Sequence, residues 1–600
     1  MRKIHRLVGV SWLALAAAAA AATPGVAFAD SGDSGASAAT TSGASTSATT
    51  ASGSSVSGGA PAFPGAAALS DLGGAPPFGT AVRLGDAGTL LAPGLSGESA
   101  PGAGIGGSGS AVPTPFIQIQ PSIGATEQFV TGGYGGYGGS GNGSGHEFVT
   151  SINPSLLING ATRATTFTLA YNPSIQFYSN QSQDNGINQS LDGVIDATLI
   201  PQMLTVEARA YATEQATSGG LPPGGSSVYN NNNRTLTQSY SITPSFNDTF
   251  ETGTLNLLYS AQFTRQSGNT AYLTNQNNPY FETGDVFAQT EAGSFTTVPF
   301  FRRFDDTPSF SATEDVGSGV LNGAHQYFIK NTVRYAIVPH VVLSASGGYE
   351  DLAYSGIPPT LIRDATWSIG ARIRFPDNGI LVARYQHLYG FNAPYIRLTY
   401  QLTQRTTLSA GYSEALSTQQ QGIGLGVASS GVNSVGLPIG GLSGQPVLLS
   451  NQSLSVQSSL TRNRQFSAAL TTQYTYDTVS LSVQAYQDTL VARAPGLVGF
   501  SQKSATVSIS ESHQFSPYAT GTVYFDYGRT DSPALNSSTT STYGFSAAFT
   551  YRLSPTLYAN AQYSLTNNAY GGYDIGGYGN TGYGSQGVQN IFTVGFRKTF

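Results

Sequence analysis

From Phe116 onward, the chain alternates apolar and polar residues with a period of two. In the clearest stretch, residues 367–375, apolar side chains occupy the odd positions, while serine, glycine and arginine occupy the even ones. Because successive residues of a strand point to opposite faces, this alternation predicts strands with one apolar face. The pattern returns over 543–552 and 557–565. Repeated segments of about ten residues are typical of strands that cross a membrane, with lipid on one side and a polar lumen on the other.

Short turn sequences separate many of these segments, and longer connections rich in glycine, asparagine and serine separate the others. The turns are Asn159-Gly160, Ile200-Pro201-Gln202, Asn247-Asp248, Val338-Pro339-His340, Pro376-Asp377-Asn378-Gly379, Gln404-Arg405, Tyr476-Asp477, Ser516-Pro517 and Ser554-Pro555. Outer-membrane barrels have short periplasmic turns and longer external loops. With both barrel ends in the periplasm, the chain is predicted to be all-β, an antiparallel, up-and-down transmembrane barrel of about 20 strands (roughly 16–22). The pattern is weakest over 265–322 and 416–462.

The first 29 residues resemble a secretory signal peptide. Three basic residues precede an apolar run over 7–22, and Ala27 and Ala29 form a small-x-small cleavage site. The apolar run is shorter than the roughly 20 residues that a membrane-spanning helix needs.

Residues 30–115 are rich in serine, alanine, glycine, threonine and proline. Such a composition buries too little apolar surface to offset the entropy of ordering, so we expect a low-complexity, disordered extension in the periplasm. A small folded plug or passenger domain is the alternative. Residues 116–600 then form the barrel.

Composition supports a membrane barrel over a soluble protein. Charged residues make up only 10% of the 600 residues, against roughly 25% in a typical soluble domain. The net charge is −6 and no long basic block stands out, so no nucleic-acid partner is expected. After the signal peptide, no apolar run is long enough for a helical span, and lipid tolerates only helices and closed barrels.

The last strand, residues 590–600, ends in an aromatic residue. Phe592, Val594, Phe596 and Phe600 share one face, which resembles the C-terminal signal that outer-membrane barrels present to their assembly machinery. Lys598 departs from this pattern, but a lysine near an interface can extend its ammonium group to water. Aromatic side chains near other strand ends are expected to form interfacial girdles: Tyr335, Tyr349, Tyr389, Tyr412, Tyr527 and Tyr551.

Charged residues at inward positions are the candidate selectivity site. Arg334, Arg372, Arg384 and Arg397 lie at similar distances from their nearest predicted turns, on neighbouring strands. Asp196 and Glu207 lie at comparable depth on earlier strands, with Arg209 close by. Opposing walls of unlike charge would set the ion preference of a pore. Alternatively, these side chains only fill a polar interior and fix the barrel's shape.

Two long segments have no assigned structure. Residues 265–322 include a candidate constriction loop with Arg302, Arg303, Asp305 and Asp306. This segment folds inward and narrows the channel, covers the outside, or contains another strand pair. Residues 415–461 carry no charge, which is unusual for an external loop and indicates packing in the lumen or contact with a partner.

Signals of catalysis are missing. The chain has no cysteine, its six histidines lack a paired metal-ligand spacing, and no G-x-S-x-G motif occurs. We therefore expect no enzyme, metal or cofactor.

Residues 116–216 resemble a known family. The resemblance is carried by 116–122 (FIQIQPS), 147–155 (EFVTSINPS), 169–174 (LAYNPS), 185–191 (NGINQSL) and 199–208 (LIPQMLTVEA). These are similar to the β-barrel porin type 2 proteins, which include outer-membrane barrels found with exosortase and exopolysaccharide loci. The resemblance implies a porin, with polysaccharide export as a further role, and it implies no catalytic residues.

Three functions follow from these observations. The first is a porin-like channel in the outer membrane of a Gram-negative bacterium, for passive diffusion of small polar or anionic solutes. The second is an exopolysaccharide export conduit that works with an inner-membrane partner. The third is a surface anchor, adhesin or receptor barrel. Expected partners are outer-membrane lipid, periplasmic chaperones, the barrel assembly machinery and further copies of the chain.

Overall fold

The computed structural model describes residues 116–131, 146–216 without 181, 183 and 184, 234–268, 284–298, 303–422 without 377 and 378, 457–569 without 498 and 533–537, and 586–600. It also describes the backbone of six short strands that form three pairs. The pairs are β1 (Ala81–Val82) with β23 (Val447–Leu448), β11 (Thr274–Asn275) with β12 (Asn278–Pro279), and β21 (Ser430–Val432) with β22 (Pro438–Gly440). The predicted signal peptide, with Ala27 and Ala29, and most of the predicted extension lie outside the described residues.

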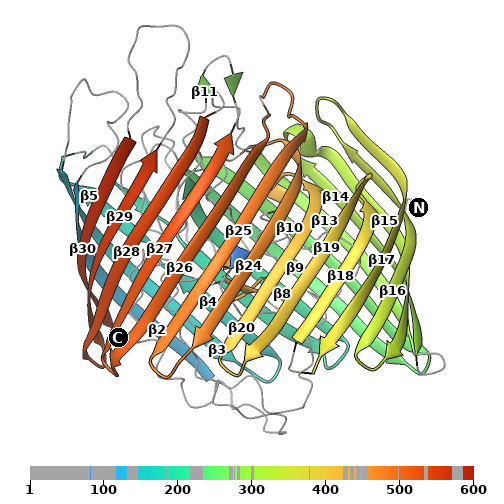
Figure 1. The fold of residues 1–600 in the computed structure, drawn as a ribbon, viewed down its shortest axis with the longest axis horizontal. Helices are drawn as coiled ribbons and strands as arrows, with labels where there is room; N and C mark the ends of the chain where they lie inside the picture. Colours follow the sequence, from blue (N-terminus) through green and yellow to red (C-terminus); the bar gives the residue numbers. More distant parts are fainter. Residues whose placement is uncertain are drawn as a thin grey trace. The chain divides into compact units, whose positions relative to one another are not determined.

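The barrel wall is a continuous series of long antiparallel strands that cross the molecule at a tilt (Figure 1). Its first half comprises β2 (Phe116–Thr131), β3 (His146–Ala161), β4 (Thr165–Tyr171), β5 (Ser174–Tyr178), β6 (Gly186–Asn188), β7 (Leu191–Ile200), β8 (Leu204–Ala216), β9 (Arg234–Phe250), β10 (Gly253–Gly268), β13 (Gly284–Thr297), β14 (Phe304–Gly317) and β15 (Asn322–Val338). The second half comprises β16 (Val341–Tyr354), β17 (Thr360–Phe375), β18 (Gly379–Leu388), β19 (Phe391–Thr403), β20 (Thr406–Ser417), β24 (Leu460–Gln473), β25 (Asp477–Ala492), β26 (Gln502–Ser516), β27 (Ala519–Ser532), β28 (Ser538–Ser554), β29 (Leu557–Ala569) and β30 (Gln586–Thr599). A short 3₁₀ helix, η3 (Gly319–Leu321), lies between β14 and β15.

The described strands close into an antiparallel barrel of 22 strands. The number is 22 because β4 with β5, and β6 with β7, each form one interrupted strand of the wall. The predicted fold class is therefore confirmed, and the strand number lies at the upper limit of the predicted range. The two strands beyond the predicted value of about 20 are β13 and β14, which the sequence pattern did not reveal.

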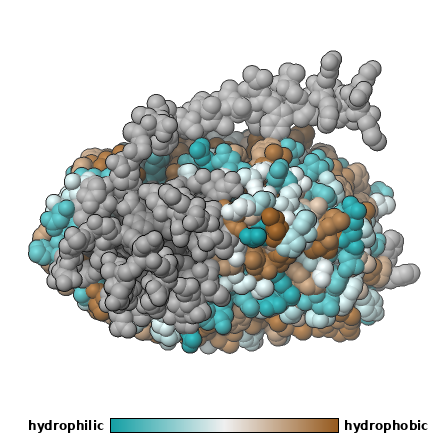
Figure 2. Space-filling model, turned by 90° about the horizontal axis from the view of Figure 1, so that it is seen from above, coloured by the Kyte–Doolittle hydropathy of each residue, from teal (hydrophilic) through white to brown (hydrophobic). Residues whose placement is uncertain are grey.

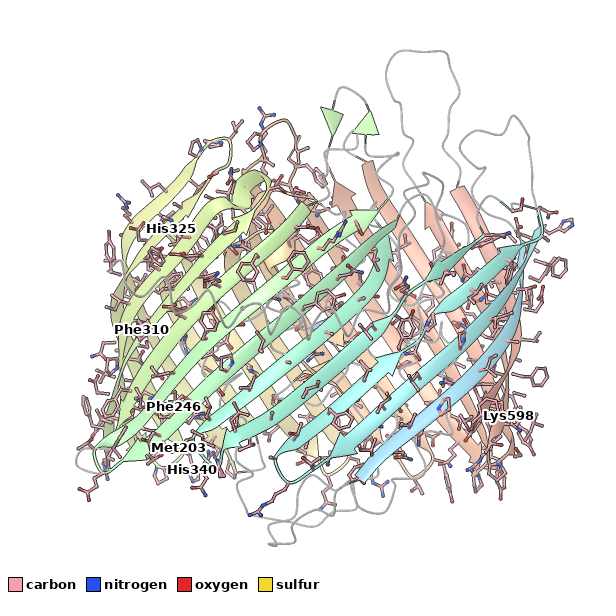
Figure 3. All side chains as sticks on the ribbon, turned by 180° about the vertical axis from the view of Figure 1, so that it is seen from behind. Met203, Phe246, Phe310, His325, His340 and Lys598 are labelled. Carbon is pink, nitrogen blue, oxygen red and sulfur yellow. The ribbon has the colours of Figure 1, made fainter. Side chains whose placement is uncertain are left out.

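Most predicted turns lie where strands meet, but two are displaced. Asn159 and Gly160 belong to β3, and the chain reverses after Ala161. Asn247 and Asp248 belong to β9, and the reversal follows Phe250. Polar turn-forming residues inside a strand are tolerated here because both pairs continue the ladder to a neighbouring strand. Figure 3 labels Met203 and His340 at the end that carries the short turns, with His325 toward the opposite, loop-bearing end.

The outer face of the wall is apolar. Large side chains such as Ile119, Ile369, Val507, Phe549 and Phe596 point outward and are exposed. Figure 2, which looks onto the loop-bearing end, shows hydrophobic residues along the lower outline of the barrel. A soluble protein rarely exposes a continuous apolar surface of this extent, whereas lipid requires one. The structure is therefore a transmembrane barrel of the outer-membrane type. Among the described residues, no helix is long and apolar enough to cross a membrane.

The first and last strands close the barrel. β2 pairs with β30 from Ser122 opposite Thr599 to Thr131 opposite Asn590. On the inner face, the Arg597 guanidinium donates to the Ser122 hydroxyl at 2.8 Å and to the Ser155 hydroxyl at 3.0 Å. This side chain therefore joins three strands, β30, β2 and β3, across the seam.

A buried apolar cluster, which we call the roof, lies at the loop-bearing end. Its members come from the ends of β13, β15, β16, β18, β20, β24 and β25 and from the connections between them: Val286, Val320, Leu321, Ala324, Leu352, Tyr354, Leu388, Tyr389, Ala415, Leu416, Leu460, Ala492, Ala494 and Leu497. Each fully buried aliphatic side chain contributes about 1.5–3 kcal/mol of hydrophobic stabilisation. Because these strands span much of the wall, the roof draws their ends together over one side of the lumen.

Polar contacts fix the connections that form the roof. Ile357, between β16 and β17, exchanges two backbone hydrogen bonds of 2.8 and 3.1 Å with Arg493, which follows β25. The Glu350 carboxylate, which is fully buried, accepts hydrogen bonds from the backbone N–H groups of Tyr389 and Gly390, each at 2.8 Å. These two residues have φ of +59° and +71°, as a two-residue type I′ hairpin requires. Tyr389 was predicted to belong to an interfacial girdle, and this prediction is wrong because the hairpin turns the ring into the roof.

Candidate functional site

The inner face of the wall is built from small polar side chains. Ser239, Thr264 and Gln262 are buried on neighbouring strands, where Ser239 bonds the Thr264 hydroxyl at 3.2 Å and Gln262 donates to Ser239 at 3.0 Å. Farther along the wall, the Ser482 and Ser508 hydroxyls lie 2.6 Å apart. These ladders continue the alternation seen in the sequence, because the residues between them face outward. The lumen is thus lined by groups that hydrogen-bond to water or to polar solutes.

The predicted arginines all lie on the inner face of neighbouring strands. One register row runs from Arg334 on β15 through Ser344 and Gly370 to Arg384 on β18. The next inward-facing row toward the short turns joins Arg372 on β17, Val382 on β18 and Arg397 on β19. The sequence therefore placed these four side chains on the correct face and at similar depth.

The four arginines differ in their partners. The Arg334 guanidinium donates to the Asp305 carboxylate at 2.6 Å and to the Thr307 hydroxyl at 2.9 Å, so its charge is compensated. Within the described part of the chain, Arg372, Arg384 and Arg397 form no ion pair with a carboxylate. Arg384 instead lies 5.5 Å from the centre of the Tyr395 ring. We call Arg372, Arg384 and Arg397 the inner arginine band.

Arg374 lies beside the inner arginine band and was not among the predicted arginines. It lies on the same face of β17 as Arg372, opposite Ile380 of β18, and it is exposed. The alternation of residues 367–375 already placed it there. Its position beside the turn, rather than at the depth of the other arginines, kept it out of the predicted set.

The predicted acidic pair lies on a distant part of the wall. Asp196 of β7 and Glu207 of β8 are direct register partners on the inner face. Arg209, next along that face of β8, is buried and donates to Asp192 at 3.2 Å. β7 and β8 belong to the fourth and fifth strands of the ring, whereas β17 to β19 are the twelfth to fourteenth. In a ring of 22, these positions are nearly opposite.

The predicted constriction loop proves to be part of the wall. Asp305 and Asp306 lie in β14, where they pair with Arg334 and Val333 of β15, and Arg303 lies in the turn before β14. Of the alternatives for 265–322, the hidden strand pair is the one that the structure shows for 284–317. The prediction of a constriction loop is wrong for Asp305 and Asp306, because both residues belong to the ladder between β14 and β15. Arg302 lies outside the described residues.

Two described parts of the uncharged segment between β20 and β24 contact distant strands of the wall. Its short strand β21 lies against β7, which is on the opposite side of the ring from β20. At the start of the segment, the Gln421 amide donates to the Asp315 carboxylate of β14 at 2.7 Å. Of the two roles considered for 415–461, packing in the lumen agrees with both contacts.

The C-terminal residues form the apolar face that the sequence predicted. Phe592, Val594, Phe596 and Phe600 are all exposed on the outer side, and the Phe600 N–H donates to the Pro121 carbonyl at 2.9 Å. Lys598 is also exposed, toward the end with the short turns (Figure 3). Recognition of this face by the assembly machinery stays a prediction.

Among the described residues, no group of three histidine, aspartate or glutamate side chains is arranged to hold a metal ion. The expectation that the chain has no enzymatic activity stays a prediction, since the lumen geometry does not test it.

No protein-family model matches the sequence, and no curated protein does either. The resemblance to β-barrel porin type 2 proteins, with its exopolysaccharide role, therefore stays a prediction. Solved structures with similar folds include the ferric enterobactin receptor PfeA of Pseudomonas aeruginosa (13% identity, 80% of each chain, TM-score 0.38). Others are the FrpB iron transporter of Neisseria meningitidis (9% identity, 80% of this chain and 81% of that chain, TM-score 0.44) and OccK2 of P. aeruginosa (11% identity, 80% and 98%, TM-score 0.30). Likeness at these identities concerns the fold alone.

Proposed function

We propose that this protein is a non-enzymatic channel of the outer membrane of a Gram-negative bacterium, through which small polar solutes diffuse with a preference for anions. The inner arginine band carries this proposal. Three guanidinium groups that have no carboxylate partner among the described residues face a lumen lined by serine, threonine and glutamine. Charge placed along a pore wall raises the local concentration of counter-ions and sets the ion preference.

The acidic pair on the opposite wall supports the same role. Asp196 and Glu207 face the lumen with Arg209 and Asp192 beside them, so positive and negative groups occupy different sides of the ring. This arrangement produces a field across the pore, which orients a polar solute as it passes. A barrel that needed charges only to fix its shape would pair them directly, as Arg334 and Asp305 do.

The test is the conductance and reversal potential of the refolded protein in a planar bilayer under a salt gradient. We expect steady steps with anion preference in the wild type. The variant Arg372→Ser/Arg384→Ser/Arg397→Ser should shift the reversal potential toward cations. Arg363→Ser is the matched control, because Arg363 lies on β17 too but is ion-paired with Asp351 on the outer face.

A receptor or surface anchor with a filled lumen is the second candidate, and the roof favours it. The roof occupies space that an open pore would leave to water, and β21 lies against β7, across the ring from β20. Barrels of 22 strands are known with plugged lumens. If a protein that still migrates as a folded barrel on unheated gels gives no conductance steps, the channel proposal is wrong and this second function stands.

A further inference from the structure

A groove of about 590 Å³ lies across β20, β24, β25, β26 and β27 near the loop-bearing end. The side chains that define it are Tyr412, Phe466, Arg464, Lys503, Arg529 and Asp531. The strand register places them on the outer face. Phe466 is paired with Tyr412, and the next outward row on β26 and β27 holds Val507 and Tyr527, which are both exposed. The groove therefore opens toward lipid.

The groove lies at the upper boundary of the apolar band. One register row, Glu414, Arg464, Gln487, Lys503 and Asp531, crosses five strands far from the short turns. Nearer the middle of the wall, outward positions of the same strands hold Leu481, Ile509 and Phe525, which are exposed. Charged groups toward the loop-bearing end and apolar groups nearer the middle of the wall are what a lipid molecule meets at the interface of a bilayer.

Two basic centres flank the groove, and each is built over a sheltered carboxylate. Asp531 is 25% exposed, whereas its partners Lys503 and Arg529, at 3.1 and 3.7 Å, are 65% and 60% exposed. Glu414 is only 5% exposed and pairs with Arg462 and with Arg464, the latter at 3.2 Å. The cations therefore face outward while the carboxylates lie beneath them. Four basic and two acidic groups leave a positive excess at the surface.

Small side chains provide room below the charges. Ala485 and Ala505 are register partners on β25 and β26 within the groove, between the Phe466 and Arg529 positions. Large side chains occupy the surrounding outward positions, so an alkyl chain can lie against the two alanines. Neighbouring strands are about 4.8 Å apart, which places the two basic centres roughly 10–15 Å from each other across β24 to β27.

We propose that this groove binds one lipid of the leaflet on the loop-bearing side whose phosphate groups give it a net negative charge, with its headgroup on Arg464, Lys503 and Arg529 and an acyl chain over Ala485 and Ala505. Guanidinium and ammonium groups are the common protein ligands of phosphate. Lipid is the occupant because the site faces the membrane and joins cations to an apolar floor. The proposal rests on the membrane placement of the barrel and is independent of conductance.

The experiment is native mass spectrometry of the detergent-solubilised barrel titrated with diphosphoryl lipid A, with phosphatidylcholine as the zwitterionic comparison. We expect retention of one lipid A molecule, and about tenfold weaker binding in Lys503→Gln/Arg529→Gln. Arg363→Gln is the control, because it removes an outward arginine elsewhere on the barrel. Ala485→Leu fills the floor without changing any charge, and it should weaken binding about threefold.

Three results would overturn the proposal: equal binding by all variants, equal retention of phosphatidylcholine, or displacement of lipid A by an equal concentration of inorganic phosphate. If the double variant loses heat modifiability, it has not folded, and lipid binding by Ala485→Leu then tests the proposal. A leucine that faces lipid at this position leaves the fold intact. A barrel that conducts but retains no lipid A refutes this inference alone, and one that retains lipid A but does not conduct refutes only the channel.

Discussion

The barrel carries two groups of arginines that have opposite surroundings. The inner arginine band, Arg372, Arg384 and Arg397, faces the lumen without ion pairs among the described residues. On the outer face, Arg464 and Arg529 share carboxylates with a second cation each. At the lipid boundary, an uncompensated charge is costly, so a carboxylate accompanies each pair. Inside the lumen, water solvates the guanidinium groups, and the wall can present bare positive charge to solutes.

The largest change in ion preference is expected when the charges of the inner arginine band are reversed. Arg372→Glu/Arg384→Glu/Arg397→Glu replaces three cations by three anions on one wall. We expect the ratio of anion to cation permeability to fall about tenfold or more, to a cation preference. Reversal potentials under a salt gradient measure it, and lipid A binding should not change. An unchanged ratio would mean that the band does not line the ion path.

A smaller change in ion preference should follow when a carboxylate is introduced beside the inner arginine band, as on the outer face. Val382 lies between Arg372 and Arg397 in one register row, on the inner face. Val382→Glu would supply both with a carboxylate, so we expect the anion preference to fall roughly threefold. Val382→Gln is the matched control of equal size. If Gln and Glu act alike, the change is steric and the charge argument fails.

The smallest effect is expected on folding stability, when the carboxylate shared by two arginines on the outer face is removed. Glu414 accepts the Tyr412 hydroxyl at 2.6 Å and pairs with Arg462 and Arg464, although the arginines are partly exposed. Glu414→Gln should lower the folding stability by about 1 kcal/mol, since solvent screens such pairs. The temperature at which the folded gel band disappears should fall by a few degrees, with the ion preference unchanged. Asp531→Asn, at a more exposed carboxylate, should have less effect; a larger drop there would contradict the ranking.

The sequence predicted much of the wall because the inward and outward alternation is a local property. It placed Arg372, Arg384 and Arg397 on one face, and it placed Phe592, Val594 and Phe596 on the other. It did not reveal β13 and β14, whose residues include many polar and small side chains on both faces and therefore alternate poorly.

Features that depend on register between strands were beyond the sequence. Asp305 and Arg334 are 29 residues apart and meet only through the ladder of β14 and β15. The burial of Tyr389 depends on Glu350 and on loop ends from distant strands. The outer groove likewise collects Arg464, Lys503 and Arg529 from three strands, and no spacing along the chain marks them as neighbours.

The seam between β2 and β30 has a consequence for how the molecule forms. Arg597 bonds Ser122 over a separation of 475 residues, so the contact that removes both open edges is also among the most remote in sequence. Until it forms, every intermediate exposes two unpaired strand edges, which are templates for aggregation. Loop closure over such a distance is slow. We therefore expect closure of the seam to be a late step of folding, so that substitutions weakening the pairing of β2 with β30 should impair assembly.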